Sequence, residues 1–119
     1  MSDDFTEVEE KLRYADYLLN REPSYPDAAV KHMLLAANKL VTMHLKIPKT
    51  ATVSPILASQ KLSIGNEEEK KYSEAYLDLW KLSIRPIVRK DEAVNAYKAT
   101  KSFLEIVKRA RGSAWPFHE

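Results

Sequence analysis

Apolar residues recur every three or four positions along most of this chain, which is the period of an amphipathic α-helix. The first such stretch starts after Asp3 or Asp4, either of which suits the N-cap position, and runs to about Asn20. Its apolar stripe consists of Phe5, Val8, Leu12, Ala15 and Leu19. Residues 21–25 break the pattern, so the first helix is predicted to end there.

The second stretch begins at Pro26, a residue that suits the first turn of a helix, and Pro48 is predicted to end it. Apolar side chains occupy a heptad-like seam and a second row beside it. The seam is Pro26, Ala29, Met33, Ala36, Leu40, Met43 and Ile47, and the second row is Val30, Leu34, Ala37, Val41 and Leu45. A helix that is apolar on so many sides either is central in the fold or carries both a core face and an oligomer contact.

Residues 49–68 show no sustained periodicity, and long connections of this kind are either functional, for example as a lid, or mobile. Within them, Ser54 and Pro55 are typical of the N-cap and first residue of a short helix. A third long helix is predicted from Asn66 or Glu67 towards Ile84. The last helix is predicted to start with Asp91 as its N-cap and to end in a basic turn before Gly112.

These elements predict an all-α fold: an antiparallel up-and-down four-helix bundle with an extra short helix in the connection between the second and third helices. Residues 1–112 are expected to form a single domain, since 119 residues suit one hydrophobic core. Residues 113–119 form a C-terminal tail with two large apolar side chains, Trp115 and Phe117. The tail is expected to dock on the bundle or on a neighbour, or to anchor another protein.

The formal charge of +2 is small, but it is unevenly distributed. Residues 1–22 hold seven acids and three bases, whereas residues 81–119 hold nine bases and four acids. Either the basic part faces a polyanion, or an acidic first helix lies beside a basic last helix within the fold or across a dimer. We favour the second interpretation, because surface charge usually does no more than solvate a helix face.

No stretch is apolar enough for a bilayer span, and the acidic first residues differ from a signal peptide, so a cytoplasmic protein without membrane contact is expected. The chain has no cysteine and no Glu-x-x-His pair for a bundle metal site, so no metal is expected. It has only two glycines, too few for a glycine-rich phosphate-binding loop, and no cofactor is expected. His44 is expected to be a hydrogen-bonded packing residue and His32 a flank residue beside the core. Tyr14, Tyr17 and Tyr25 are expected in the core or an interface, with a cleft lining as the alternative.

Two segments, residues 14–47 and 72–110, resemble the HEPN family of small prokaryotic helical bundles. The shared features are a first helix closed by a turn that ends in a tyrosine, an alanine-rich second helix entered directly from that turn, and a last helix with regularly spaced alanines before Phe103. The resemblance implies a four-helix bundle that is commonly dimeric. Many members partner a minimal nucleotidyltransferase, and the catalytic members are metal-independent ribonucleases with an Arg-x(4–6)-His motif.

Arg85 and Arg89 lie near the position where the resemblance places that arginine, but neither is followed by a histidine at the required spacing. Arg111 and His118 match the spacing formally, yet Gly112 and Pro116 lie between them, so the two side chains are not expected to face each other. We therefore predict a noncatalytic HEPN-like bundle, a homodimeric interaction or substrate-binding subunit with a nucleotidyltransferase as one expected partner.

Two alternatives stay open. The first is a metal-independent ribonuclease that uses Arg85, Arg89 and the basic last helix. The second is an RNA-binding or nucleotide-binding protein, with phosphate contacts that weaken steeply as salt rises. Its candidate residues on the last helix are Lys98, Lys101, Lys108 and Arg109.

Overall fold

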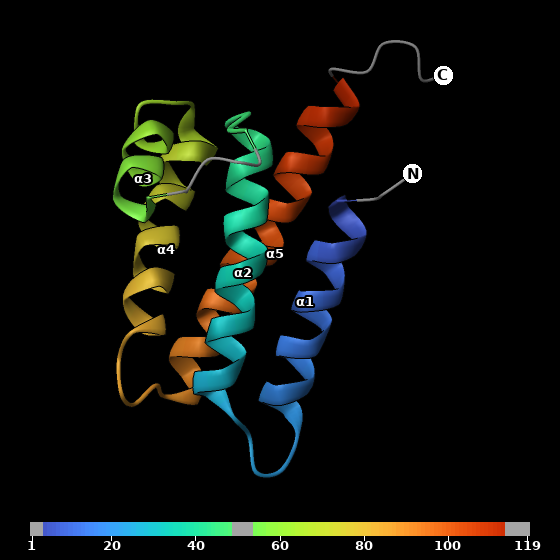
Figure 1. Ribbon diagram of the computed structural model, residues 1–119, viewed down its shortest axis with the longest axis vertical. Coiled ribbons are helices and arrows are strands. Elements are labelled where there is room, and N and C mark those ends of the chain that lie inside the picture. Colours follow the sequence, from blue (N-terminus) through green and yellow to red (C-terminus); the bar gives the residue numbers. More distant parts are fainter. Residues whose placement is uncertain (1–3, 49–53, 114–119) are drawn as a thin grey trace.

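The computed structural model describes residues 4–48 and 54–113, and these ranges contain five helices and no strand (Figure 1). The helices are α1 (Asp4–Asn20), α2 (Pro26–His44), α3 (Pro55–Ser63), α4 (Glu67–Ser83) and α5 (Lys90–Ser113). The predicted all-α class is thereby confirmed. None of the helices in these ranges combines the length and the apolar character that a membrane crossing requires.

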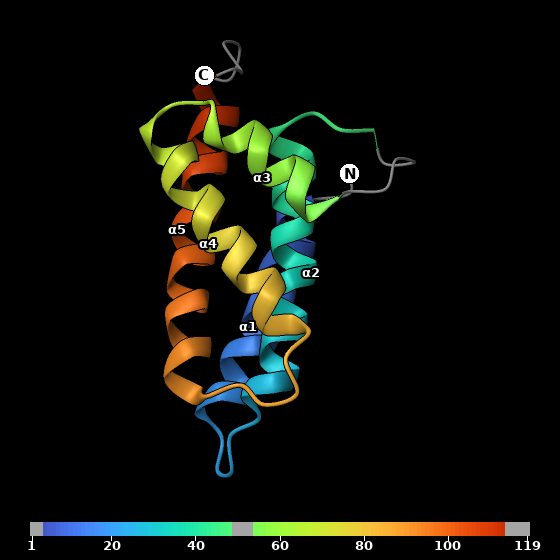
Figure 2. The same ribbon diagram turned by 90° about the vertical axis from the view of Figure 1, so that its left-hand side faces the viewer.

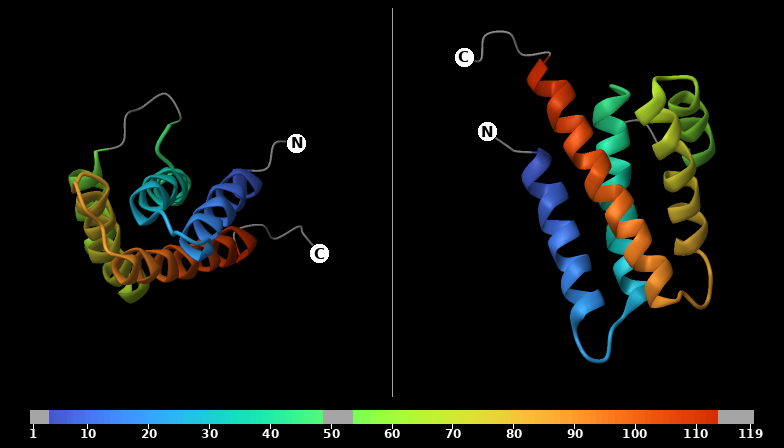
Figure 3. Two further views of the ribbon diagram at one scale, coloured as in Figure 1. Left: turned by 90° about the horizontal axis from the view of Figure 1, so that it is seen from below. Right: turned by 180° about the vertical axis from the view of Figure 1, so that it is seen from behind.

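The four longer helices lie along the long axis of the molecule and alternate in direction, while the short α3 packs against α4 near one end (Figures 1 and 2). In the view from below, α2 lies between α4 and α1, and α5 runs across the lower part of the picture from α4 towards α1 (Figure 3). Helix α2 contacts α1, α4 and α5. Its wide apolar surface is therefore explained by a central position within one chain. The fully buried side chains of α2 are Ala29, Val30, Met33, Ala36, Ala37, Leu40 and Val41.

Helix α2 ends at His44, so the predicted end at Pro48 is wrong. Lys46 adopts a left-handed conformation with φ 59°. The Ile47 N–H donates to Thr42 O at 2.9 Å, and the Lys46 N–H donates to Met43 O at 3.3 Å. This pattern of a left-handed residue with two reversed hydrogen bonds is a Schellman cap, which stops a helix without any proline.

Side-chain caps define the starts of α3 and α4. The Leu57 N–H donates to Ser54 Oγ at 3.4 Å, so Ser54 is the N-cap of α3 as expected. At the start of α4 the Glu69 N–H donates to Asn66 Oδ1 at 2.8 Å, and the Asn66 N–H donates to Glu69 Oε1 at 2.7 Å. This reciprocal capping box confirms the predicted start of α4.

Both predicted ends of the last helix are wrong. Asp91 lies in the first turn of α5 and is not its N-cap, because the Ala93 N–H already donates to Arg89 O and the Glu92 carboxylate accepts the Arg89 N–H, both at 3.1 Å. At the other end α5 continues through Gly112 to Ser113. A glycine inside a helix costs only about 1 kcal/mol, and here it does not stop the helix.

One buried cluster with side chains from all five helices forms the core, and its aromatic part lies where α4 and α5 face α2. The rings of Tyr72 and Phe103 stack with their centroids 4.0 Å apart, and the fully buried Tyr76 donates its hydroxyl to Asn38 Oδ1 at 2.6 Å. Several expectations lie outside the described residues: the N-cap role of Asp3, part of the lid in the connection, and the role of the tail from residue 114, which includes His118.

Candidate functional site: a groove between α4 and α5

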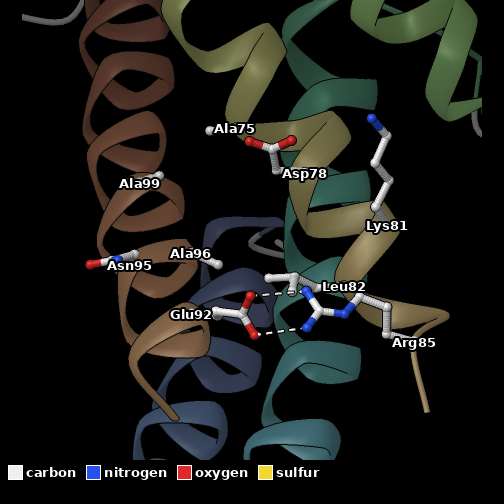
Figure 4. A pocket seen from close by; sticks show the side chains of 9 residues that line it. All are labelled: Ala75, Asp78, Lys81, Leu82, Arg85, Glu92, Asn95, Ala96 and Ala99. Atoms are coloured by element: carbon white, nitrogen blue, oxygen red, sulfur yellow. Dashed lines mark hydrogen bonds and ion pairs between the residues drawn. The ribbon is translucent and has the colours of Figure 1, made fainter. Parts of the chain in front are cut away.

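A groove of about 540 Å³ lies between α4 and α5 (Figure 4). Helix α4 and Arg85, which lies two residues after it, supply one wall, and the first half of α5 supplies the other. The lining residues are Ala75, Asp78, Lys81, Leu82, Arg85, Glu92, Asn95, Ala96 and Ala99. Both helices contact each other and α2, so the groove lies on the packed bundle.

Small side chains create this groove. Ala75 on α4 and Ala96 and Ala99 on α5 are half-buried, and each extends only one carbon from its backbone. Leu82 is buried and completes an apolar floor. Ala96 and Ala99 are three residues apart and so lie on the same face of α5. The floor can accept a side chain or a helix that approaches both backbones closely.

Charged and polar side chains surround this floor. Asp78 and Lys81 on α4 and Asn95 on α5 are exposed. Together with Arg85 and Glu92 they give the groove two positive and two negative groups. A groove of balanced charge suits a protein surface with both signs better than a polyanion such as RNA.

One end of the groove is closed by an ion pair. Arg85 Nη1 donates to Glu92 Oε2 at 2.9 Å and Arg85 Nη2 donates to Glu92 Oε1 at 3.1 Å, a bidentate arrangement that Figure 4 shows. The Arg85 hydrogen bonds, followed by the Arg89 backbone N–H, lower the pKa of Glu92 below its usual value. Nearer the other end of both helices, Arg109 Nη2 donates to Glu68 Oε2 at 3.3 Å. Ion pairs therefore join α5 to α4 on one side of the alanine-lined region and to the segment after α4 on the other.

The six cations proposed from the sequence do not form one patch. Arg85 pairs with Glu92 as described above, and Arg89 Nη2 donates to Asp91 Oδ2 at 2.6 Å. Lys108 reaches α1, where its Nζ donates to Glu9 Oε2 at 2.6 Å, while Arg109 reaches α4. Lys98 and Lys101 are exposed on α5. Four of the six cations thus bind carboxylates of their own chain.

The contact between Glu9 and Lys108 places the acidic first helix beside the basic last helix within one chain. Another acid of α1, Glu7, pairs with Lys39 of α2 at 3.4 Å. The uneven charge distribution favoured such a pairing either within the fold or across a dimer, and the structure shows it within the fold. Carboxylates of α1 thereby neutralise cations that the alternative, a polyanion-binding face, would need.

Neither described histidine lies beside the groove cations. His44 Nε2 is 2.6 Å from Glu69 Oε2, and its ring meets Phe103 edge-on at 5.4 Å, which confirms the expected hydrogen-bonded packing role. The pKa of Glu69 is lowered, first by the Asn66 backbone N–H and then by the His44 hydrogen bond. His32 meets the Tyr14 ring edge-on at 4.7 Å. Within the described ranges, no three histidine, aspartate or glutamate side chains are grouped as metal ligands.

Sequence reasoning identified Arg85 but missed the groove beside it. Alanines at helical spacing are typical of a buried helix face, and Ala93 is indeed fully buried. Asn95 between Ala93 and Ala96 is a local signal that this face turns towards solvent. The Arg85–Glu92 pair spans the connection between two helices, so no helical spacing rule could predict it.

Comparisons with family models, curated proteins and solved structures gave no match.

Proposed function

We propose that this chain is a noncatalytic HEPN-like bundle that acts as a dimeric interaction or substrate-binding subunit. The fold assigned with this role is an antiparallel up-and-down four-helix bundle in which α3 is an extra helix within the connection. Support comes from the alternating directions of α1, α2, α4 and α5 and from the place of α3 between α2 and α4 in the chain. A cytoplasmic location and a nucleotidyltransferase partner belong to the same proposal.

The observation that carries the noncatalytic role is the bidentate pair between Arg85 and Glu92. A ribonuclease of the Arg-x(4–6)-His type needs its arginine for phosphate and a histidine for proton transfer. Here the arginine donates to a carboxylate, and the histidine rings in the described part of the chain contact Glu69, Phe103 and Tyr14 instead.

We assign the dimer contact to the α4–α5 groove, with a second copy of this chain as its occupant. Asp78 and Lys81 are three residues apart on α4 and lie at the same rim. A twofold axis that passes between them brings each Asp78 opposite the Lys81 of the other copy, so the face is complementary to itself. The alanines on the floor allow the two copies of the helix pair to approach closely.

Cysteine cross-linking tests this contact directly, because the natural chain contains no cysteine. Chains with Asp78→Cys and chains with Lys81→Cys are mixed and oxidised. A disulfide-linked dimer of the two different chains is expected, since their Cβ atoms would lie within the few ångströms that a disulfide spans. The matched control is a mixture of Lys98→Cys and Glu105→Cys chains, whose exposed residues do not line the groove. Equal cross-linking in both mixtures, or none in the first, refutes the assignment.

Nucleic-acid binding is the second candidate, because Lys98 and Lys101 are exposed one turn apart on α5. A filter-binding assay with single-stranded RNA separates the candidates. The interaction-subunit role predicts no cleavage and weak binding that does not change when both lysines are replaced by glutamine. RNA cleavage that Arg85→Gln abolishes, or binding that Lys98→Gln with Lys101→Gln removes, would establish the corresponding alternative.

A further inference from the structure

An exposed aromatic strip runs along one side of α1, away from the α4–α5 groove. Tyr14 and Tyr17 lie three residues apart on α1, and Arg21 follows directly after the last residue of this helix. The Arg21 N–H donates to Tyr17 O at 3.1 Å, so Arg21 continues the same side of the chain. The side chains of Tyr14 and Tyr17 are 48% and 54% exposed, and Tyr25 beside them is 44% exposed. A row of half-exposed tyrosine rings forms an apolar patch on the surface, and such patches are typical of binding surfaces.

Arg21 is held within this strip by aromatic rings. Its guanidinium carbon lies 4.8 Å from the ring centroid of Tyr25 and 5.7 Å from that of Tyr17. Its Nε is enclosed and finds no hydrogen-bond acceptor among residues 4–48 and 54–113. No carboxylate in those ranges forms an ion pair with it, in contrast to Arg85, Arg89 and Arg109. A guanidinium fixed by stacking and without an acid is a ready receptor for a carboxylate.

The strip has a regular spacing. The ring centroids of Tyr14 and Tyr17 are 6.0 Å apart, with an angle of 22° between their planes. The Tyr17 ring centroid lies 5.7 Å from the guanidinium carbon of Arg21. In an extended peptide, side chains on the same side are separated by two residues, or roughly 6.5 Å. Three alternate side chains of an extended segment can therefore meet the three groups of the strip in turn.

We propose that the strip formed by Tyr14, Tyr17 and Arg21 binds an extended peptide segment of a partner protein with the pattern apolar-x-apolar-x-acidic. The two apolar side chains lie on the tyrosine rings, and the carboxylate accepts hydrogen bonds from Arg21. The Tyr25 ring also contacts the guanidinium, at 4.8 Å from its centroid to the guanidinium carbon. This surface is separate from the α4–α5 groove, so the proposal does not depend on the dimer contact.

Charge and size favour a short peptide over other occupants. Glu10, Glu22 and Asp27 are exposed on the same segment of the chain, and they would repel a nucleic-acid backbone while tolerating a single carboxylate at Arg21. Three half-exposed tyrosines offer roughly 100 Å² each, which is well below the ~800 Å² per partner of a stable protein interface. The area suits a linear peptide bound at micromolar or weaker affinity and is too small for a second copy.

Fluorescence anisotropy with a labelled peptide Ser-Val-Thr-Val-Thr-Glu-Ser tests the proposal. We expect saturable binding to the wild-type chain with a Kd of about 100 µM. Replacing the peptide glutamate by glutamine, or permuting the core to Val-Val-Thr-Thr-Glu, should each weaken binding at least about fivefold. These peptide controls use the unaltered protein and so do not depend on the folding of any variant.

Protein variants identify the site. Arg21→Gln and Tyr17→Ala should lower affinity by about fivefold or more, with Arg21→Lys intermediate because lysine lacks the planar fork. Arg89→Gln is the matched control, since it removes the same charge from an exposed arginine elsewhere. Equal loss with Arg89→Gln, an unchanged affinity for the glutamine peptide, or displacement by a single-stranded oligonucleotide at lower concentration than the free peptide would each overturn the proposal.

Discussion

His44 at the end of α2 and Glu69 in the first turn of α4 meet through Nε2 and Oε2 at 2.6 Å. The same carboxylate accepts the Asn66 N–H through its other oxygen, Oε1, at 2.7 Å. Glu69 therefore caps its own helix and binds the neighbouring one at the same time. This double role fixes where the chain turns from α3 into α4 and how that turn sits against α2.

Removing the charge of Glu69 should destabilise the fold in a pH-dependent way. The Asn66 N–H and His44 keep the pKa of Glu69 below its ordinary 4.5 in the folded state. Its contribution is thus complete above that value and is lost as pH falls through the lower folded pKa. We expect Glu69→Gln to cost about 1–2 kcal/mol near pH 6 and progressively less at more acidic pH.

Urea unfolding followed by circular dichroism over that pH range measures the effect of Glu69→Gln. Glu74→Gln, an exposed acid on the same helix, is the control for the change in net charge. A constant difference between wild type and Glu69→Gln down to the acid limit would contradict the role assigned to the carboxylate.

Position 65 accommodates only glycine because the Glu69 side chain occupies the space that a Cβ would take, and not because of the backbone conformation. A Cβ at this position would overlap Oε1 and Cδ of Glu69, while the backbone φ of Gly65 is not in the left-handed region. Gly65→Ala should therefore destabilise the wild-type chain by about 1 kcal/mol, because the capping box is displaced.

A double-mutant cycle separates these two causes. With Glu69→Ala already present, Gly65→Ala should be neutral or slightly stabilising, as is usual for Gly→Ala where space allows. The same loss in both backgrounds would show that the glycine serves some purpose other than accommodating Glu69.

Alkaline stability should depend on Tyr76. Burial raises the pKa of Tyr76 to about 12, whereas a tyrosine in an unfolded chain titrates near 10. The neutral phenol therefore favours the folded state below pH ~10, and this advantage is lost as pH rises through the folded pKa. Tyr76→Phe should cost about 1 kcal/mol at neutral pH, since Asn38 Oδ1 loses its donor.

Above pH ~10 the wild-type chain should lose stability more steeply than Tyr76→Phe, because only the wild-type chain carries this phenol. Burial raises the pKa of Tyr72 as well, so some slope is expected to persist in the variant. Parallel stability curves for the two chains in chemical denaturation would be evidence against a buried neutral Tyr76.

The helices were predictable because their signals are local. Ser54, Asn66 and Pro26 mark helix starts that the structure confirms, and the apolar stripes give the buried faces. The errors at Pro48 and Asp91 also have local causes. Lys46 is left-handed and ends α2 before Pro48, and the Glu92 carboxylate, not that of Asp91, accepts the Arg89 N–H at the start of α5.

The candidate site was less predictable because it depends on contacts between helices. Arg85 and Glu92 belong to different elements, and alanine at helical spacing is equally compatible with a core and with an open groove. Arg21 is similar: the sequence shows a cation among tyrosines, but only the packing shows that no described acid pairs with it.

The molar mass in solution, determined by light scattering at two concentrations about a hundredfold apart, distinguishes a dimer from a monomer. We expect twice the chain mass of 13.7 kDa at the higher concentration, with a shift towards the monomer when Ala99→Glu places a charge on the groove floor. A mass of 13.7 kDa at both concentrations would contradict the proposed dimeric subunit.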